Sequence, residues 1–137
     1  MISTKGRYAV RVMIDLAEQN SSTPVPLNNI ALRQDISKKY LESIVKLLVT
    51  GGLLKGTSGK GGGYYLTRTP KEYTVLEILE LTEGDSLIPV SCLEKNAEAC
   101  PRKKECRTIS MWSGYEKLFQ DYFSNITIAD LCHGELS

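Results

Sequence analysis

The chain has 137 residues and a mass of 15.2 kDa, which suits one domain, or one small domain with an appendage, and excludes a large multidomain enzyme. Its 42% hydrophobic and 24% charged residues are ordinary for a globular chain and exclude wholesale disorder. No apolar run approaches the roughly 20 residues that span a bilayer. The basic start shows no secretory signal, so we expect a cytoplasmic protein without a membrane partner.

The N-terminal third of the chain predicts three helices. Apolar residues recur at three- and four-residue spacings from about Thr4 to Glu18, which is the pattern of an amphipathic helix. Two prolines in the following loop prevent its continuation, and a short helix is expected over Leu27–Gln34. Ser37 is a good N-cap for a third helix, which Gly51 and Gly52 terminate. The second and third helices, joined by a tight turn, predict a helix-turn-helix motif.

A β-hairpin is predicted directly after this motif. Two short strands are expected over Leu53–Thr57 and Tyr64–Thr67, joined by a glycine-rich loop with Lys60 at its tip. The loop does not match a Walker phosphate-binding motif, because Leu54 and Gly61 occupy positions that need glycine and a hydroxyl residue. We therefore discard nucleotide binding and interpret the hairpin as a wing. The expected fold is mainly α with a small β-hairpin wing.

Formal charge is divided unevenly along the chain. Residues 1–32 carry a net charge of +1, residues 33–68 carry +5 and residues 69–137 carry −5, within an overall charge of +1. A basic surface gains affinity for a polyanion by releasing condensed counterions. The alternative, that these charges only solvate a surface, stays open. The outward face of the third helix, within the basic segment, carries Lys38, Lys39, Tyr40, Glu42 and Lys46.

Two further helices are expected in the C-terminal half. Thr74 and Glu77 have the spacing of a capping box, which opens a helix ending near Gly84. After an irregular stretch, a long helix is predicted from Arg107 to Asn125, and Thr127 can cap a last short turn. An aromatic-rich stripe on the long helix favours a homodimer seam over packing onto the chain's own domain. The stripe consists of Ile109, Trp112, Tyr115, Phe119 and Tyr122.

Three cysteines gather in the irregular stretch. Cys92, Cys100 and Cys106 are widely spaced in a flexible segment, which lets three thiolates converge on one centre. Structural zinc sites usually show short paired spacings, so an iron–sulfur cluster fits somewhat better. Redox sensing by thiols and inert cysteines stay open as alternatives. Cys132 and His133, near the C-terminus, form a pair that is more often incidental than ligating.

These pieces together resemble the Rrf-two (Rrf2) family of bacterial winged helix-turn-helix transcription regulators, closest to its iron–sulfur regulators. The resemblance covers nearly the whole chain and is carried by residues 3–9, 36–42, 59–64 and 125–127. It implies a homodimer that binds a palindromic double-stranded DNA operator, with recognition helices in successive major grooves and wings in the minor groove. The single histidine, His133, lies near the C-terminus, and no carboxylate pair or nucleophile motif stands out. We therefore expect a protein that is not an enzyme and takes no small-molecule substrate.

The resemblance assigns expected roles to the residues above. The implied DNA contacts are Lys38, Lys39, Tyr40, Glu42 and Lys46 on the helix, with Ser58, Gly59 and Lys60 on the wing. Cys92, Cys100 and Cys106 match the family's ligands for an iron–sulfur cluster, for which we expect the 2Fe–2S type rather than the 4Fe–4S type, easily lost in air.

The fourth ligand departs from the family's patterns. Ile109 stands where iron–sulfur regulators carry a histidine, and Arg7 stands where nitric oxide sensors carry an acidic residue. An exogenous ligand and four residues of the chain remain candidates: Glu98, Glu105, Cys132 and His133. The wing also differs, because Ser58, Gly59 and Lys60 replace the arginine-glycine-proline of the iron–sulfur regulator.

The expected organisation has three parts. Residues 1–84 form the winged helix-turn-helix DNA-binding domain, residues 85–106 the cluster-binding loop, and residues 107–137 the dimerisation helix and C-terminal tail. The leading hypothesis is a regulator that senses cluster status, iron, or redox and nitric oxide stress. The alternative within the family is a cluster-free regulator of cysteine metabolism that senses through thiols or a partner protein. A small iron–sulfur electron carrier is the alternative outside it, and leaves the basic helix and wing unexplained.

Overall fold

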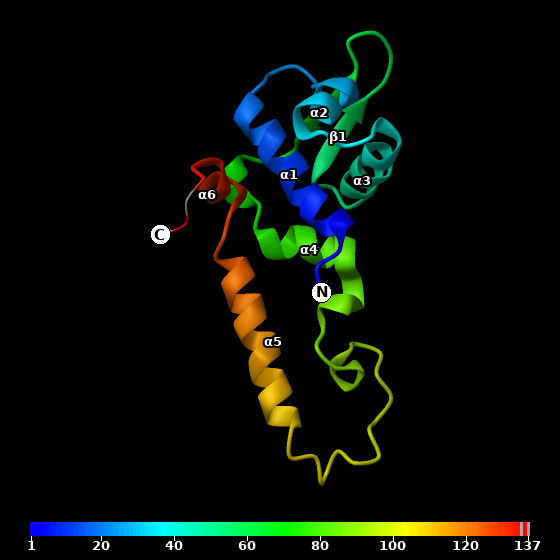
Figure 1. The fold of residues 1–137 in the computed structure, drawn as a ribbon, viewed down its shortest axis with the longest axis vertical. Coiled ribbons are helices and arrows are strands. Elements are labelled where there is room, and N and C mark those ends of the chain that lie inside the picture. Colours follow the sequence, from blue (N-terminus) through cyan, green and yellow to red (C-terminus); the bar gives the residue numbers. More distant parts are fainter. Residues whose placement is uncertain (135, 137) are drawn as a thin grey trace.

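The computed structural model describes residues 1–134 and 136 of the chain, and over these the fold is mainly α-helical with one two-stranded hairpin, as the sequence predicts (Figure 1). In chain order the elements are α1 (Thr4–Gln19), α2 (Leu27–Gln34), α3 (Lys38–Thr50), β1 (Leu54–Thr57), β2 (Gly63–Leu66), η1 (Pro70–Glu72), α4 (Val75–Glu83), η2 (Gly84–Leu87), η3 (Ser91–Leu93), α5 (Ile109–Ser124) and α6 (Ile128–Cys132), where η marks a 3₁₀ turn. No helix in the described part of the chain is long and apolar enough to cross a membrane.

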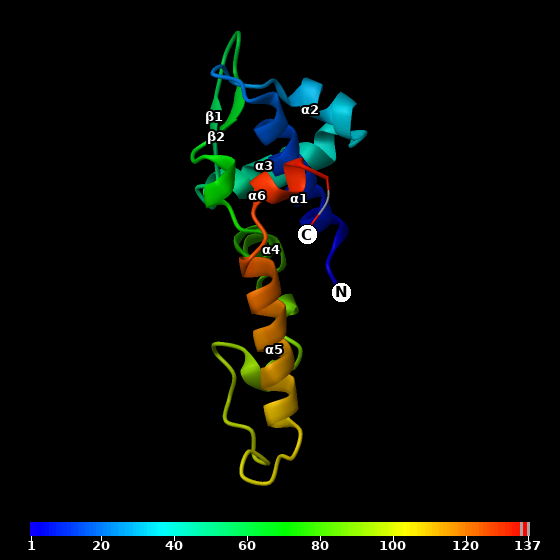
Figure 2. The same cartoon turned by 90° about the vertical axis from the view of Figure 1, so that its left-hand side faces the viewer.

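The molecule is elongated, with two visibly different parts. We call residues 1–83 together with 126–134 the head, and residues 84–125 the stalk. The head contains α1 to α4, the hairpin and α6, whereas α5 and the long irregular segment before it extend away as the stalk (Figures 1 and 2). The wing tip and the cysteine-containing segment therefore lie at opposite ends of the long axis (Figure 2).

The core of the head is assembled around α1. Ala9, Val12 and Met13 are fully buried there, on the stripe that the sequence periodicity predicts. The helix-turn-helix pair packs on α1 with its own buried residues. The fully or nearly fully buried apolar side chains that α2, α3 and α4 contribute to this core are Ile30, Leu41, Ile44, Val45, Leu48 and Ile78.

Local signals set the ends of α3 as predicted. The Ser37 hydroxyl accepts a hydrogen bond from the backbone N–H of Tyr40 at 3.2 Å, which caps the N-terminus. At the other end the N–H groups of Gly52 and Leu53 donate to the carbonyls of Val49 and Leu48, and Gly52 takes a φ of +79°. This is a Schellman ending, which needs a residue without a Cβ at the left-handed position. It turns the chain directly into β1.

Tyr73 fastens the base of the hairpin to the head. Its ring is fully buried, and its hydroxyl accepts from the N–H groups of Thr67 and Arg68, each at 2.8 Å. The same hydroxyl donates to the Leu53 carbonyl at 2.9 Å. Both ends of the hairpin are thereby bonded to one buried side chain. Val25 adds a short antiparallel bridge to Tyr64, which widens the sheet on its other edge.

The predicted capping box at α4 is only half right. The Thr74 hydroxyl accepts from the N–H of Glu77 at 3.2 Å, as expected. The Glu77 carboxylate does not return to Thr74 but forms a bidentate pair with Arg68, at 2.7 and 2.9 Å. A bidentate guanidinium–carboxylate pair is stronger than a single bond to a backbone N–H, so the tertiary partner wins. This pair ties α4 to the end of the hairpin.

The C-terminal residues return from the stalk to the head. Thr127 caps α6 as predicted, and Ile128 is fully buried against the core around α1. The N–H of Ile128 donates to the carbonyl of Tyr73 at 3.0 Å, and the N–H of Val75 donates to the carbonyl of Ile126 at 2.9 Å. The end of α5 is therefore anchored in the head by α6.

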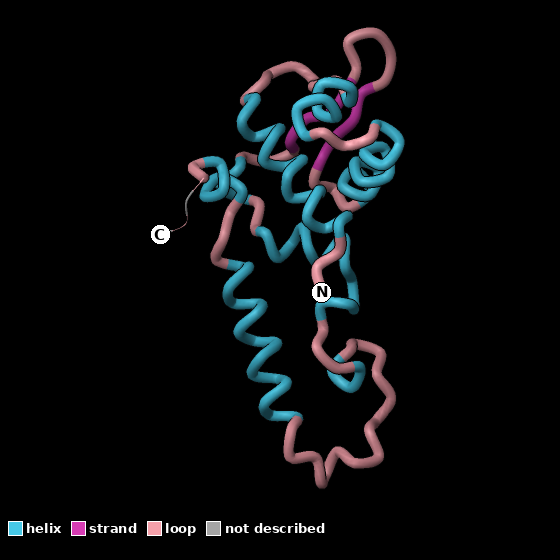
Figure 3. The backbone as a smooth tube through the Cα atoms, viewed as in Figure 1, coloured by secondary structure: helices cyan, strands magenta, loops and turns pink. Residues whose placement is uncertain are grey.

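The stalk, in contrast, is largely loop apart from α5 (Figure 3). Between Gly84 and Thr108 only two short 3₁₀ turns interrupt an irregular path, as the sequence predicts for this segment. No residue of α5 is buried within the single chain.

Candidate DNA interface and cysteine cavity

The outward face of α3 is a cationic surface on a rigidly held helix. The buried stripe of α3 fixes the helix against the head, so that Lys38, Lys39, Glu42 and Lys46 point to solvent. None of these four forms a salt bridge with another described residue. Three ammonium groups and one carboxylate are thus available to an external partner.

Tyr40 differs from these neighbours because its ring is partly buried. It packs edge-on against Tyr8 of α1 at a centroid distance of 5.8 Å, and the Arg11 guanidinium lies 4.9 Å from the centre of the Tyr8 ring. Arg11 also donates to the side chain of Gln34 in α2. The predicted contact residue Tyr40 therefore holds the N-terminal turn of α3 against α1, leaving only part of its ring exposed.

An ion pair joins α2 to α1, with its carboxylate buried and the Arg33 side chain 35% exposed. Asp15 is 2% exposed and accepts two hydrogen bonds from Arg33, at 2.8 and 3.0 Å, and one from Gln34 at 2.9 Å. The bond to Asp15 raises the pKa of the Arg33 guanidinium. The buried Asp15 carboxylate thus accepts two charge-assisted hydrogen bonds from Arg33 and one from the amide of Gln34. These bonds hold α2, the first helix of the helix-turn-helix, against α1.

The wing tip projects beyond the rest of the head (Figure 2). Ser58, Gly59 and Lys60 are all exposed there, and Gly59 takes a φ of +87°, where a Cβ is disfavoured. Lys55 on β1 is exposed as well and adds a second cation to the hairpin. The sequence analysis did not select Lys55, although its alternation with buried Leu54 indicates an outward side chain. In Figure 1 α3 and the wing lie on the same side of the head.

The three stalk cysteines line one cavity. It has a volume of about 260 Å³ and is bordered by Cys92, Cys100 and Cys106. The other side chains around it are Leu93, Ala97, Glu98, Ala99, Lys103 and Ile109. All three thiols are free rather than joined in disulfides.

The donor set around the cavity has the chemistry of an iron–sulfur ligand set. Its three cysteines supply soft thiols, which are the protein ligands that such clusters take, and the rest of the lining is largely apolar. Among the described residues, however, no three His, Cys, Asp or Glu side chains are grouped closely enough to hold one metal ion.

The thiols of the chain differ in their readiness to ionise. Hydrogen bonding from the Thr108 hydroxyl, 3.6 Å from the sulfur, lowers the pKa of Cys106, and the Thr108 N–H and the charge of Arg102 add to this. Burial and the nearby Glu18 carboxylate raise the pKa of Cys132 instead. Cys106, which lines the cavity, therefore loses its proton more readily than an ordinary cysteine thiol, and Cys132 less readily.

The candidate fourth ligands separate clearly in space. Ile109 lines the cavity, so the position that the family resemblance assigns to histidine carries an alkyl side chain. Cys132 and His133 lie at the end of α6 in the head, at the opposite end of α5 from the cavity (Figure 1). Glu105 is outside the cavity lining, whereas Glu98 is part of it.

The stalk helix exposes an apolar stripe that differs from the predicted one. Trp112, Tyr115 and Tyr122 are exposed, as a seam requires, but Ile109 and Phe119 are partly buried by the chain's own residues. Met111 and Leu118, which the sequence analysis did not select, are exposed at 55% and 72%. The spacing of Met111, Tyr115, Leu118 and Tyr122 places them on one helical stripe.

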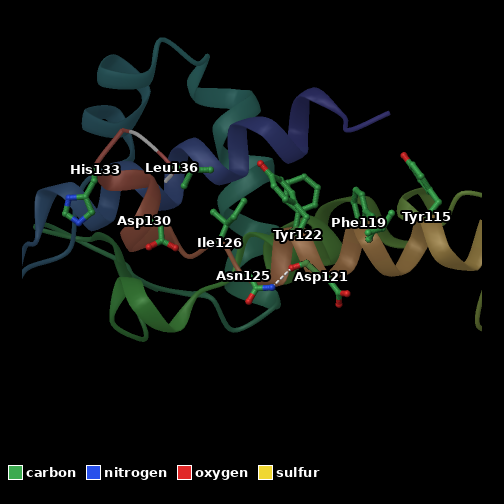
Figure 4. A pocket seen from close by; sticks show the side chains of 11 residues that line it. Tyr115, Phe119, Asp121, Tyr122, Asn125, Ile126, Asp130, His133 and Leu136 are labelled. Carbon is green, nitrogen blue, oxygen red and sulfur yellow. Dashed lines mark hydrogen bonds between the residues drawn. The ribbon is translucent and has the colours of Figure 1, made fainter.

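This stripe borders a large open groove between α5 and α6. The groove has a volume of about 1200 Å³ and includes Tyr115, Leu118 and Tyr122 on one side and Ile126 and His133 on the other. Figure 4 labels Tyr115, Tyr122, Ile126 and His133 along the groove, and its dashed line marks the hydrogen bond from the Asn125 side chain to the Asp121 carbonyl, at 2.6 Å. The groove is mainly aromatic and aliphatic in character, with acidic residues at its edge.

A comparison of the sequence with protein-family models decides the family. Residues 2–134 match the Rrf2 model, described as an iron-dependent transcriptional regulator. The chain belongs to the Rrf2 family. A curated relative, the HTH-type transcriptional regulator IscR of Serratia proteamaculans (strain 568), is 34% identical over 134 residues, covering 98% of this chain and 80% of its own.

Solved Rrf2 structures share the whole architecture. CymR (YrzC), the global cysteine regulator of B. subtilis, matches with a TM-score of 0.75 and 32% identity, over 99% of this chain and 98% of its own. IscR of T. potens matches with a TM-score of 0.74 and 31% identity, over 100% of this chain and 92% of its own. The winged-helix fold with a long C-terminal helix is thereby confirmed. The alternative of a small electron carrier finds no support, since these relatives are transcription regulators.

Proposed function

We propose that this Rrf2 protein is a dimeric regulator that reads a palindromic double-stranded DNA operator and couples that binding to an iron–sulfur cluster. The observation that carries the DNA-binding part is the free cationic face of α3 beside an exposed basic wing. In this proposal residues 1–84 bind DNA, residues 85–106 hold the cluster and α5 forms the dimer.

The recognition helix is α3. Lys38, Lys39 and Lys46 neutralise phosphates beside the major groove, which fixes the helix in register. The Glu42 carboxylate accepts from the amino group of cytosine and so discriminates between bases. Tyr40, held against Tyr8, presents its remaining exposed edge to the backbone.

The wing lies in the adjacent minor groove. Ser58, Gly59 and Lys60 form its contacting tip, and Lys55 adds a phosphate contact along the hairpin. A lysine rather than an arginine enters the groove, so the preference for narrow, A·T-rich segments is weaker than an arginine gives. The anchorage of the hairpin to Tyr73 holds this tip at a fixed distance from α3.

A second copy of the chain covers the exposed stalk helix. Trp112, Tyr115 and Tyr122, with the flanking groove, supply a large apolar area that one chain leaves in water. The predicted Ile109 and Phe119 line the inner side of the same helix and support it. Two heads joined in this way present two recognition helices to the half-sites of a palindrome.

Cys92, Cys100 and Cys106 hold the cluster, of the 2Fe–2S type, in the cavity that they line. When bound, the cluster supplies a redox-active and oxidant-labile centre that cross-links the irregular segment. The stalk begins at the end of α4, where the Glu83 carboxylate accepts from both the N–H and the hydroxyl of Ser3, each at 2.7 Å. Glu83 and Ser3 therefore connect the start of the cluster loop to the start of α1.

The DNA-binding proposal is tested by salt-dependent binding to a duplex from the protein's own promoter. We expect the slope of log K against log salt to fall by roughly one for each of Lys39→Ala, Lys46→Ala and Lys60→Ala. Lys71→Ala is the matched control, because Lys71 is an exposed lysine on η1 that the proposal does not place among the DNA contacts. An unchanged slope in the triple lysine variant contradicts the assignment of this surface.

A cluster-free regulator is the second candidate. The observation that favours it is the TM-score to the global cysteine regulator CymR, which equals that to IscR within 0.01. Counts of iron and acid-labile sulfide on anaerobically purified protein separate the two. Matched iron and sulfide support the cluster, whereas iron-free protein that still binds DNA supports thiol or partner-protein sensing.

A further inference from the structure

One acidic residue, Glu98, is among the described residues that line the cysteine cavity. Apart from the three cysteines, its lining consists of four apolar side chains with Lys103 and Glu98. We propose that the Glu98 carboxylate is the fourth protein ligand of the cluster, an inference that rests on the proposed cluster function.

The other side chains around the cavity cannot take this role. Ile109 has no lone pair to donate, and the ammonium of Lys103 is a hydrogen-bond donor without an acceptor site. The remaining candidates, Glu105, Cys132 and His133, do not line the cavity, and the last two lie in the head. Among the described residues, Glu98 is thus the one lining residue other than cysteine whose side chain can ligate iron.

Glu98 is also free to move onto an iron. Its side chain is exposed and has no hydrogen bond or salt bridge to another described residue. It lies in the irregular segment between η3 and Cys100, where no helix or strand fixes the backbone. Ligation therefore breaks no existing interaction of the carboxylate.

The charges and donor types around the cavity predict that the affinity of the Glu98 carboxylate for iron depends on the oxidation state of the iron. Three thiolates and one carboxylate bring four negative charges to the cluster, and Lys103 in the same lining offsets one of them. A carboxylate is a harder donor than a thiolate, so it binds ferric iron better than ferrous iron. A bond from Glu98 to iron would therefore be weaker in a reduced cluster than in an oxidised one, which would make Glu98 the labile ligand.

The test compares clusters in wild-type protein and in loop variants, each reconstituted anaerobically with ferrous iron and sulfide. For Glu98→Ala we expect the half-life of the visible absorbance in air to fall at least about tenfold, because even second-shell losses cost 10–100-fold in metal affinity. Glu98→Cys is expected to keep the wild-type iron content, with its visible and reduced-state paramagnetic resonance spectra changed to those of an all-thiolate cluster. Glu105→Ala, a carboxylate beside Cys106 but outside the cavity, serves as the matched control.

The outcomes separate the ligand from the cluster. If Glu98→Ala matches Glu105→Ala in iron, sulfide, spectrum and half-life, Glu98 is not a ligand. The same conclusion follows if Glu98→Cys leaves the wild-type spectrum unchanged. A wild-type chain that takes up no iron or sulfide overturns the cluster proposal and the ligand with it. Circular dichroism of each variant confirms that the fold is retained, which the exposed position of Glu98 predicts.

Discussion

The head and the stalk differ in how much of their structure one chain completes. In the head, buried apolar side chains from five helices and the hairpin meet in a common core. In the stalk, no residue from Gly84 to Asn125 is buried. Among the described residues every buried polar side-chain atom has a hydrogen-bond partner, Asp15 included. The head therefore completes its own core, whereas the stalk leaves large apolar side chains exposed in the single chain.

This difference suits the two parts to different roles in the proposed function: the head to holding the DNA-binding surface, and the stalk to responding to a bound cluster. A DNA-reading surface needs fixed spacing between α3 and the wing, which a satisfied core provides. In the proposed function the cluster loop, residues 85–106, is the sensing segment, and its order depends on what it binds. Elements with few buried contacts open at low free-energy cost, so we expect this loop to rearrange without unfolding of the head.

The largest expected effect comes from a core truncation in the head. Leu48→Ala on α3 removes a fully buried side chain, which costs about 2–5 kcal/mol of unfolding free energy through lost burial and the cavity left behind. Leu118→Ala makes the same chemical change in the stalk, where the side chain is 72% exposed. Urea unfolding followed by far-ultraviolet circular dichroism measures both. Equal losses for the two variants at low protein concentration contradict the division between head and stalk.

The next largest expected effect is a weakening of the proposed dimer. Leu118→Ala and Tyr122→Ala each truncate an exposed side chain of the stripe, and we expect each to raise the dimer dissociation constant about tenfold, or about 1.4 kcal/mol. Sedimentation measures this constant. Lys117→Ala is the control, because Lys117 pairs with Asp121 at the surface of the same helix.

Trp112 provides a second readout of the dimer. It is the one tryptophan of the chain and lies on α5, where it is 36% exposed. Dilution below the dissociation constant shifts its emission to longer wavelength, while the circular dichroism of the head stays constant. Emission that does not change with concentration, in a protein that sediments as a dimer, places the seam elsewhere.

Elements with strong local signals could be predicted from the sequence. The periodicity of α1, the Ser37 cap and the glycines that end α3 act over a few residues, so they are visible without tertiary structure. Local turn and strand signals also predict the hairpin, and the ends of both expected strands agree with β1 and β2 to within one residue. The three cysteines could be grouped because thiols in one loop have a common chemistry.

Other features depend on partners distant in sequence. The spacing of Thr74 and Glu77 predicts a capping box at α4, but the Glu77 carboxylate pairs with Arg68. This pairing depends on the fold, which brings the end of the hairpin beside α4. The partial burial of Tyr40 depends on Tyr8, 32 positions away in the printed sequence. The choice of Glu98 over Glu105 depends on the path of an irregular loop, which no periodicity encodes.

The smallest effect lies where α6 joins the stalk to the head. Asp130 completes a capping box at α6: its carboxylate accepts from the Thr127 N–H at 2.9 Å, and its own N–H donates to the Thr127 hydroxyl at 3.1 Å. Hydrogen bonding to Thr127, that of the backbone N–H above all, lowers the pKa of the Asp130 carboxyl. Because the folded-state pKa lies below the unfolded value, the ionised carboxylate stabilises the fold above the ordinary aspartate pKa of about 3.9. That contribution is lost as the pH falls through the lowered pKa.

Asp130→Ala is therefore expected to lower Tm at pH 7 and to approach the wild-type Tm at an acidic pH below the lowered pKa of Asp130, where the wild-type carboxyl is protonated. Asp85→Ala, an exposed aspartate of η2 whose carboxylate forms no hydrogen bond with a described side chain, controls for the general loss of negative charge. A difference in Tm that is the same at both pH values shows that the side chain acts by packing rather than as an ionised cap. A closing difference shows that the charge of one capping residue holds α6, and with it the upper end of α5, on the head.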